Sequence, residues 1–175
     1  MPWCGLGSVP SASPPHGMPS DTLLSIDPGV RYLALAYWRA QTLVSAAVVR
    51  GGTPARLAAA AGLWAPYAAR IAVEWPRSYR GRRAPERDLE GLRRAVVATE
   101  VWYRANSPLE PTIRRYYPST WKGQVPKRVH RSRIDRELTQ NEKNRSGAYQ
   151  SDIWDAIGIG LFALGRVGVG GARLD

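Results

Sequence analysis

The sequence contains few of the residue types on which disulfide-rich folds and many metal sites depend. Its 175 residues include one cysteine, Cys4, and two histidines, His16 and His130. A single cysteine excludes an intrachain disulfide framework and a thiolate metal site, which suits a reducing cytoplasm. We expect both histidines to be solvated. No apolar run approaches the ~18–20 residues that a membrane helix needs, so no membrane partner is expected.

Acidic residues and lysine are also scarce. The formal net charge is +11, and only three of the 25 basic residues are lysines. Residues 75–145 contain eighteen Lys or Arg against eight Asp or Glu. Basic charge concentrated in one part of a chain is typical of a protein with a polyanionic partner. The alternative is an acid-poor solvated surface encoded by an arginine-rich genome.

The chain length favours one α/β domain. The first twenty residues contain Pro, Ser and Gly but no Lys or Arg, so they lack the charged start of a signal peptide. We therefore predict a disordered leader over residues 1–20, one domain over residues 21–168, and a frayed tail over residues 169–175. The expected location is the cytoplasm of a bacterium or of a phage-infected host.

Apolar runs and turn signals predict the order of the elements. Three strands joined by tight turns come first, as an antiparallel meander, and helices then alternate with two further strands. The predicted strands are 22–26, 32–38, 42–49, 70–74 and 112–117, and the predicted helices are 53–69, 86–105, 127–139 and 152–167. Thr53 and Pro54 open the first helix as N-cap and N1 residues. Residues 75–85 are predicted to form a loop, and residues 141–151 a mobile polar segment. This order is typical of the RNase H-like fold, with a five-stranded mixed sheet flanked by helices.

Four acidic residues stand at the ends of apolar elements. Asp27 and Glu74 each end a buried strand, and Asp152 and Asp155 lie three residues apart at the start of the last apolar helix. A buried carboxylate is costly unless a cation compensates it. Each acid also has a structural alternative: a turn, a solvent-exposed strand end, or a favourable place at a helix N-terminus. Together they predict a cage for hard divalent cations, which prefer oxygen ligands.

In a basic chain such a cage indicates phosphate chemistry. Two Mg²⁺ or Mn²⁺ ions about 4 Å apart can activate a water and stabilise the leaving oxygen of a phosphodiester. We therefore expect a metal-dependent hydrolase with two ions in each active site.

The same residues resemble the motifs of RuvC-type Holliday junction resolvases. The resemblance is carried, in order, by residues 24–29 (LSIDPG), 71–74 (IAVE), 120–122 (TWK) followed by Pro126 and Lys127, and 152–158 (DIWDAIG). It spans about residues 22–167. The segment between Lys122 and Lys127 is shorter than in the bacterial enzymes, which bears on cleavage-sequence preference.

The resemblance implies an RNase H-like homodimer that nicks four-way DNA junctions with Mg²⁺ or Mn²⁺. By motif match, Asp27, Glu74, Asp152 and Asp155 are the metal ligands. Lys122 and Lys127 take the phosphate-facing catalytic positions. An aromatic side chain that holds the junction open is expected after the second acid, where Trp75 and Tyr79 both qualify; either ring can equally be packed under its loop.

The expected DNA contacts extend over the basic segments. They are Trp75, Arg77, Tyr79, Arg80, Arg82, Arg83, Lys122, Lys127, Arg128 and Arg131. Two other functions remain open at this point: an RNase H-type or flap nuclease with the same metal site, and a non-catalytic module that binds branched DNA.

Overall fold

The computed structural model describes residues 21–78, 85–145 and 151–169. Five strands form one mixed sheet: β1 (Thr22–Pro28), β2 (Tyr32–Arg39), β3 (Thr42–Arg50), β4 (Arg70–Glu74) and β5 (Thr112–Tyr116). Their order across the sheet is β3-β2-β1-β4-β5. The pairs β1–β2 and β2–β3 are antiparallel, whereas β1–β4 and β4–β5 are parallel. The predicted meander and the predicted parallel crossover are both confirmed.

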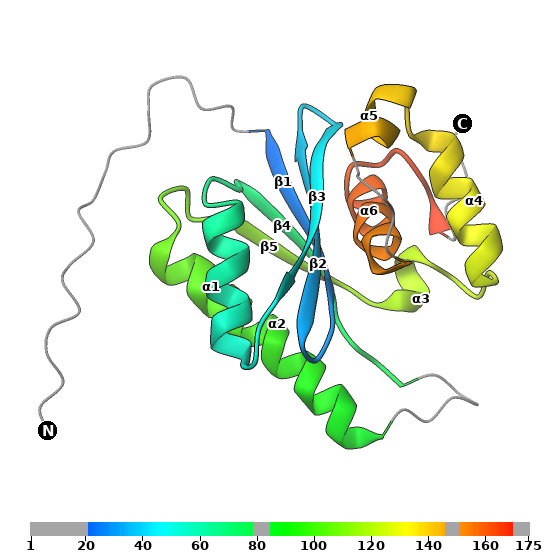
Figure 1. The fold of residues 1–175 in the computed structure, drawn as a ribbon. Coiled ribbons are helices and arrows are strands. Elements are labelled where there is room, and N and C mark those ends of the chain that lie inside the picture. Colours follow the sequence, from blue (N-terminus) through cyan, green and yellow to red (C-terminus); the bar gives the residue numbers. More distant parts are fainter. Residues whose placement is uncertain (1–20, 79–84, 146–150, 170–175) are drawn as a thin grey trace, which may run out of the picture.

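Helices cover the two faces of this sheet (Figure 1). The helices α1 (Pro54–Trp64) and α2 (Glu86–Asn106) lie on one face. The other face carries α3 (Pro118–Trp121), α4 (Lys127–Glu137), α5 (Gln140–Arg145) and α6 (Ser151–Ala163). The sheet is therefore the middle of three layers, with a hydrophobic core on each side.

The alternation of side chains along β1 builds both cores at once. Leu24 and Ile26 belong to the core under α1 and α2, whereas Leu23 belongs to the core under α6. Ser25 is buried on the α6 side, where its hydroxyl accepts a 2.9 Å hydrogen bond from the Trp38 indole. A strand buried on both faces is expected for the centre of an α/β sheet.

The start of α1 is as predicted, but its end is not. The Thr53 hydroxyl accepts a hydrogen bond from the Arg56 amide at 3.3 Å, and Pro54 occupies the first turn. The helix ends at Trp64 instead of continuing to residue 69. Pro66 accounts for this, because a proline disfavours helical geometry in the residue before it and cannot donate a backbone hydrogen bond.

Three local expectations need correction. Residues 140–145 form α5 instead of a mobile segment, because Glu142 is buried and forms an ion pair with Arg166. His130 is also buried, not solvated, and its ring meets Trp121 edge to face at 5.0 Å. The short helix α3 was not predicted at all. No helix in the described ranges is long and apolar enough to span a membrane. The predicted leader lies outside those ranges, as does the tail beyond residue 169.

Candidate active site

The four predicted acids come from three elements that meet at one edge of the sheet. Asp27 lies near the end of β1 and Glu74 ends β4, and the parallel register pairs Ile26 with Val73 just before them. Because the carboxyl ends of parallel strands lie at the same edge, the two acids are neighbours. Asp152 and Asp155 stand on the first turns of α6, which packs against β1.

Electrostatic coupling shows that the four carboxylates form one cluster. Burial raises the pKa of Asp27 well above its usual range, and Glu74, Asp155 and Asp152 raise it further. Burial likewise raises the pKa of Glu74 to about 7, and Asp155 adds to the shift. The Lys122 ammonium lowers both values but does not offset the burial. Burial and the neighbouring acids therefore oppose the ionised forms of Asp27 and Glu74, which a bound cation would stabilise.

The two predicted lysines both reach this cluster. Lys122 Nζ lies 2.8 Å from Asp155 Oδ2, and Lys127 Nζ lies 3.9 Å from the same oxygen. Lys122 follows α3, whereas Lys127 begins α4. All six residues predicted to act in catalysis are thus brought together at one point of the fold.

The carboxylate oxygens of the cluster are donors that suit a hard metal ion. The side chains do not form a coordination geometry in this structure. In residues 21–78, 85–145 and 151–169, no group of three or more His, Cys, Asp or Glu side chains is arranged to hold a metal as it stands. Instead, the Lys122 ammonium lies beside Asp155 and partly neutralises the cluster. All the anionic groups of the cluster are carboxylates, which are the ligands that Mg²⁺ and Mn²⁺ prefer.

Two residues at the site were given no role in the sequence analysis. Trp121 donates from its indole Nε1 to Glu74 Oε2 at 3.0 Å, which orients that carboxylate. Tyr32 donates a hydrogen bond to Asp152, and burial together with the nearby acids raises the pKa of Tyr32 to about 12. Tyr32 also packs on the turn at Gly29, where any added Cβ would lie only 2.5 Å from its ring. Gly29 is therefore required for this contact.

Little in the sequence identified these two residues in advance. Trp121 stands next to Lys122 in the motif 120–122, and this position could have indicated that it lies at the site. Tyr32 begins β2 just after the turn, where its carbonyl accepts a 2.8 Å hydrogen bond from the Gly29 amide, and the folded turn brings its side chain to the acids.

An open cleft of about 1140 Å³ includes part of the cluster, and both basic and acidic residues line it. Asp27, Asp152 and Asp155 of the cluster line it together with Lys127, and so do Asp88 and Glu90 of α2. Its arginines come from the β1–β2 turn, from the end of β3 and from α2: Arg31, Arg50, Arg87 and Arg94. Of these, Arg94 is paired with Glu90 at 3.0 Å. The cations of this cleft can hold a polyanion close to the acids of the cluster.

Trp75, one of the two aromatic residues expected to hold the junction open, makes structural contacts within the fold. The Arg115 guanidinium lies 4.1 Å from the centroid of the Trp75 ring and forms a two-pronged ion pair with Glu100. The ring also packs against the core under α1 and α2. These contacts favour the alternative in which Trp75 is packed under its loop. Tyr79, Arg80, Arg82 and Arg83 lie outside the described residues.

The remaining predicted DNA contacts are more accessible. Arg77 is exposed and lies over the ring of Tyr117, with 5.6 Å between guanidinium carbon and ring centroid. Arg128 is exposed on α4 next to Lys127. Arg131 lies 4.9 Å from the centroid of the Trp154 ring, close to the acids of α6. The basic residues of α4 therefore border the same cluster from the side opposite α2.

Comparisons with known proteins show which fold the chain has. No family model matches the chain, and no curated protein matches it. Among solved structures, Thermus thermophilus RuvC aligns with a TM-score of 0.55 and 18% identity, over 82% of this chain and 95% of that chain. The same protein in complex with a Holliday junction substrate aligns with a TM-score of 0.51, the same identity and the same coverage.

A third structure, of the yeast mitochondrial Holliday junction resolvase Ydc2, aligns at 14% identity and a TM-score of 0.49. It covers 81% of this chain and 79% of that chain. With three antiparallel strands, two parallel strands and helices on both faces, this chain has the RNase H-like fold of RuvC.

Proposed function

We propose that the protein is a metal-dependent endonuclease that cleaves branched DNA, with the four-way junction as its main substrate. The observation that carries this proposal is the convergence of Asp27, Glu74, Asp152 and Asp155 with Lys122, next to a cleft that Asp27, Asp152 and Asp155 share with four arginines. The fold supports it, since RuvC has been solved in complex with a Holliday junction. The proposed setting is recombination and repair, or the processing of phage DNA.

The four carboxylates, Asp27, Glu74, Asp152 and Asp155, would hold Mg²⁺ or Mn²⁺, two ions in each site. Their oxygens fit such ions, and a cation would offset the burial and the repulsion that raise the pKa values of Asp27 and Glu74. When bound, the ions supply Lewis acidity and a water of lowered pKa.

The residues of the chain position the reacting groups. In the reaction, a water oxygen bonds to phosphorus and loses a proton, one ester P–O bond breaks, and the departing oxygen takes up a proton, so that no net proton is consumed. Lys122 and Lys127 stand beside Asp155, where their ammonium groups can contact the non-bridging oxygens of a phosphodiester. Trp121 keeps Glu74 facing the cluster through its 3.0 Å hydrogen bond.

The cleft and α4 would hold the DNA backbone. The arginines of the cleft, with Arg77, Arg128 and Arg131, supply contacts that depend on salt and not on sequence. Two such sites in a homodimer would cut two strands symmetrically, which is why we infer that the working unit is a dimer.

A substrate panel tests this function. Purified protein is incubated with Mg²⁺ and equal amounts of labelled four-way junction, flap, linear duplex and RNA–DNA hybrid. We expect paired, symmetric nicks on the junction and little product from duplex. Preferential cutting of the hybrid or the flap would assign the same site to an RNase H-type or flap nuclease. Tight junction binding without cleavage in any divalent metal would instead support a binding module whose acids are structural.

Substitution of Lys122 tests whether this lysine acts in catalysis or only in the structure of the site. Changing Lys122 to Met keeps the length of the side chain and removes the ammonium that lies 2.8 Å from Asp155. Loss of one electrostatic donor to the reacting phosphate typically costs ~10²–10³-fold in rate. We expect a loss of this size in single-turnover cleavage of the junction.

The matched control is Lys143→Met, which removes a lysine of α5 that is paired with Asp135 of α4 at 3.0 Å. It should cleave at close to the wild-type rate. Equal losses in the two variants, or none in Lys122→Met, would show that Lys122 does not act on the substrate.

A further inference from the structure

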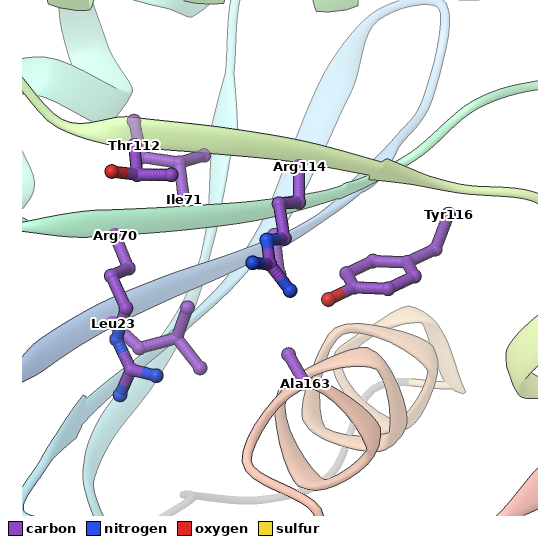
Figure 2. Close-up of a pocket in the computed structure, with 8 residues that line it drawn as sticks. Leu23, Arg70, Ile71, Thr112, Arg114, Tyr116 and Ala163 are labelled. Carbon is purple, nitrogen blue, oxygen red and sulfur yellow. The ribbon is translucent and has the colours of Figure 1, made fainter.

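A cavity of about 260 Å³ lies between the sheet and α6, away from the carboxylate cluster (Figure 2). Its apolar floor is formed by Leu23 and Ala72 of the sheet and by Ala163 near the end of α6. None of the four acids lines it, and neither does Lys122 or Lys127. The cavity is therefore separate from the candidate active site.

The strand register places the polar residues of this cavity on one face. In the parallel pair β4–β5, Arg70 is paired with Thr112, Ala72 with Arg114, and Glu74 with Tyr116. Alternate residues of a strand share a face, so the side chains of β5 at 112, 114 and 116 all point toward the α6 side. Figure 2 shows Arg114 and Tyr116 directed to this side, above Ala163. Arg70 at this cavity and Glu74 at the carboxylate cluster are four residues apart along β4, a distance of about 13 Å.

The charged groups at this cavity are two arginines. Arg114 forms no ion pair within the part of the chain that the structure describes. Arg70 is held by Asp21 through Nη2 at 2.8 Å. Its other N–H groups remain available, since a guanidinium carries five donors. Hydroxyl groups of Thr112 and Tyr116 complete the polar lining.

An alternative explanation is that Arg114 merely protects an exposed sheet edge. β5 is the last strand of the sheet, and charged side chains on such strands discourage pairing with other chains. Edge protection does not require a cavity, or a second arginine and two hydroxyls around the same space. The combination of these groups over an apolar floor points to a ligand instead.

We propose that this cavity binds a phosphate group. A guanidinium presents parallel N–H donors that match the oxygens of a phosphate, and hydroxyls can donate to the remaining ones. The volume lies below the ~300–1,000 Å³ typical of sites for drug-sized ligands, so it suits one phosphate with a small substituent. The phosphate comes either from the DNA backbone or from a free phosphate-bearing molecule. This site goes beyond the proposed nuclease function and does not depend on it.

Titration with inorganic phosphate tests the site directly. Two-dimensional ¹H–¹⁵N spectra are recorded at constant ionic strength, with sodium chloride alone as the reference. We expect saturable shifts at the Arg114 side chain and at the amides of Ala72 and Ala163 in the wild type. Arg114→Gln should weaken the apparent affinity at least tenfold. Arg104→Gln removes an exposed arginine at the end of α2, and its affinity should match the wild type.

Binding of four-way junction DNA in EDTA then separates the two sources of phosphate. If the slope of log K against log[salt] falls by about one unit in Arg114→Gln but not in Arg104→Gln, the cavity contacts a DNA phosphate. If phosphate binding is lost while the slope is unchanged, the ligand is a free phosphate-bearing molecule. Linear, non-saturating shifts in the wild type would overturn the proposal. So would equal weakening in the two variants, provided that their thermal unfolding curves match that of the wild type.

Discussion

Replacing Asp27 by asparagine is expected to abolish junction cleavage while leaving the fold intact. Asparagine has the same shape but removes the charge nearest the centre of the cluster, where Glu74, Asp155 and Asp152 all act on Asp27. Removing one member of a catalytic set that acts as a unit typically costs ~10³-fold or more in rate. Single-turnover cleavage of a labelled junction in saturating Mg²⁺ measures the loss.

Stability gives a second readout for the same variant. In the wild type without metal, burial and like charges oppose the ionised form of Asp27. The amide avoids this repulsion, so at neutral pH without metal Asp27→Asn should unfold at the same temperature as the wild type or higher.

The control is Asp135→Asn, which changes a half-exposed aspartate on α4 that pairs with Lys143. It should cleave normally. Cleavage by Asp27→Asn at the wild-type rate would remove the carboxylate cluster from the mechanism.

Replacing Glu142 by glutamine is expected to lower the free energy of unfolding more than the other substitutions do. Its carboxylate is 2% exposed and lies 2.6 Å from Arg166 Nη1. It also accepts hydrogen bonds from the backbone amides of Leu43, at 2.9 Å, and Thr139, at 2.8 Å. Arg166 in turn donates to the carbonyls of Gln41 and Glu137. The pair thus connects β3, α4 and α5 to the segment after α6.

Breaking a buried ion pair by removing one charge costs ~3–5 kcal/mol, because the other charge remains buried without its partner. Chemical denaturation of Glu142→Gln should show a loss of free energy of unfolding in this range. A matched control is Glu86→Gln, which breaks the surface pair with Arg93 at 3.0 Å and should cost less than ~1 kcal/mol. Equal effects in the two variants would show that the Glu142 pair is not a structural link.

The same residue predicts a dependence of stability on pH. Hydrogen bonds from Arg166, Leu43 and Thr139 outweigh the effect of burial and lower the pKa of Glu142 from 4.5 to about 2. A carboxyl whose pKa is lower in the folded state stabilises the fold above its unfolded pKa. This contribution is lost as the pH falls from about 4.5 to about 2.

Thermal unfolding of wild type and Glu142→Gln across that range measures the effect. The difference between the two unfolding temperatures should shrink as the pH falls. A constant difference would contradict the assigned pKa.

Much of the fold could be predicted because its signals are local. The apolar runs and the cap at Thr53 specify their elements without reference to the rest of the chain. The order of strands and helices then leaves few topologies, and the observed sheet is the expected one. The misplaced parts depend on distant contacts. α5 forms around Glu142 because Arg166 lies beside it, and His130 is buried because it packs against Trp121.

Some residues of the candidate site could likewise be predicted from local sequence, whereas others reach the site only in the folded chain. Asp27, Glu74, Asp152, Asp155, Lys122 and Lys127 stand in recognisable motifs, and the fold brings them together. Tyr32 and Trp121 act through side-chain geometry that no local pattern specifies. The cleft arginines Arg31 and Arg50 are likewise isolated in sequence and meet the site only in the folded chain. The contact between Trp75 and Arg115 links two strand ends 40 residues apart, which sequence spacing alone does not predict.

The dependence of junction cleavage on a divalent metal tests the central claim most directly. Labelled four-way junction is incubated with wild-type protein in Mg²⁺, in Mn²⁺, in EDTA, and in EDTA followed by excess Mg²⁺. The carboxylate cluster predicts paired nicks in either metal, none in EDTA, and full recovery when Mg²⁺ is restored. Nicking in EDTA at an undiminished rate, or no nicking under any of these conditions, would contradict the account.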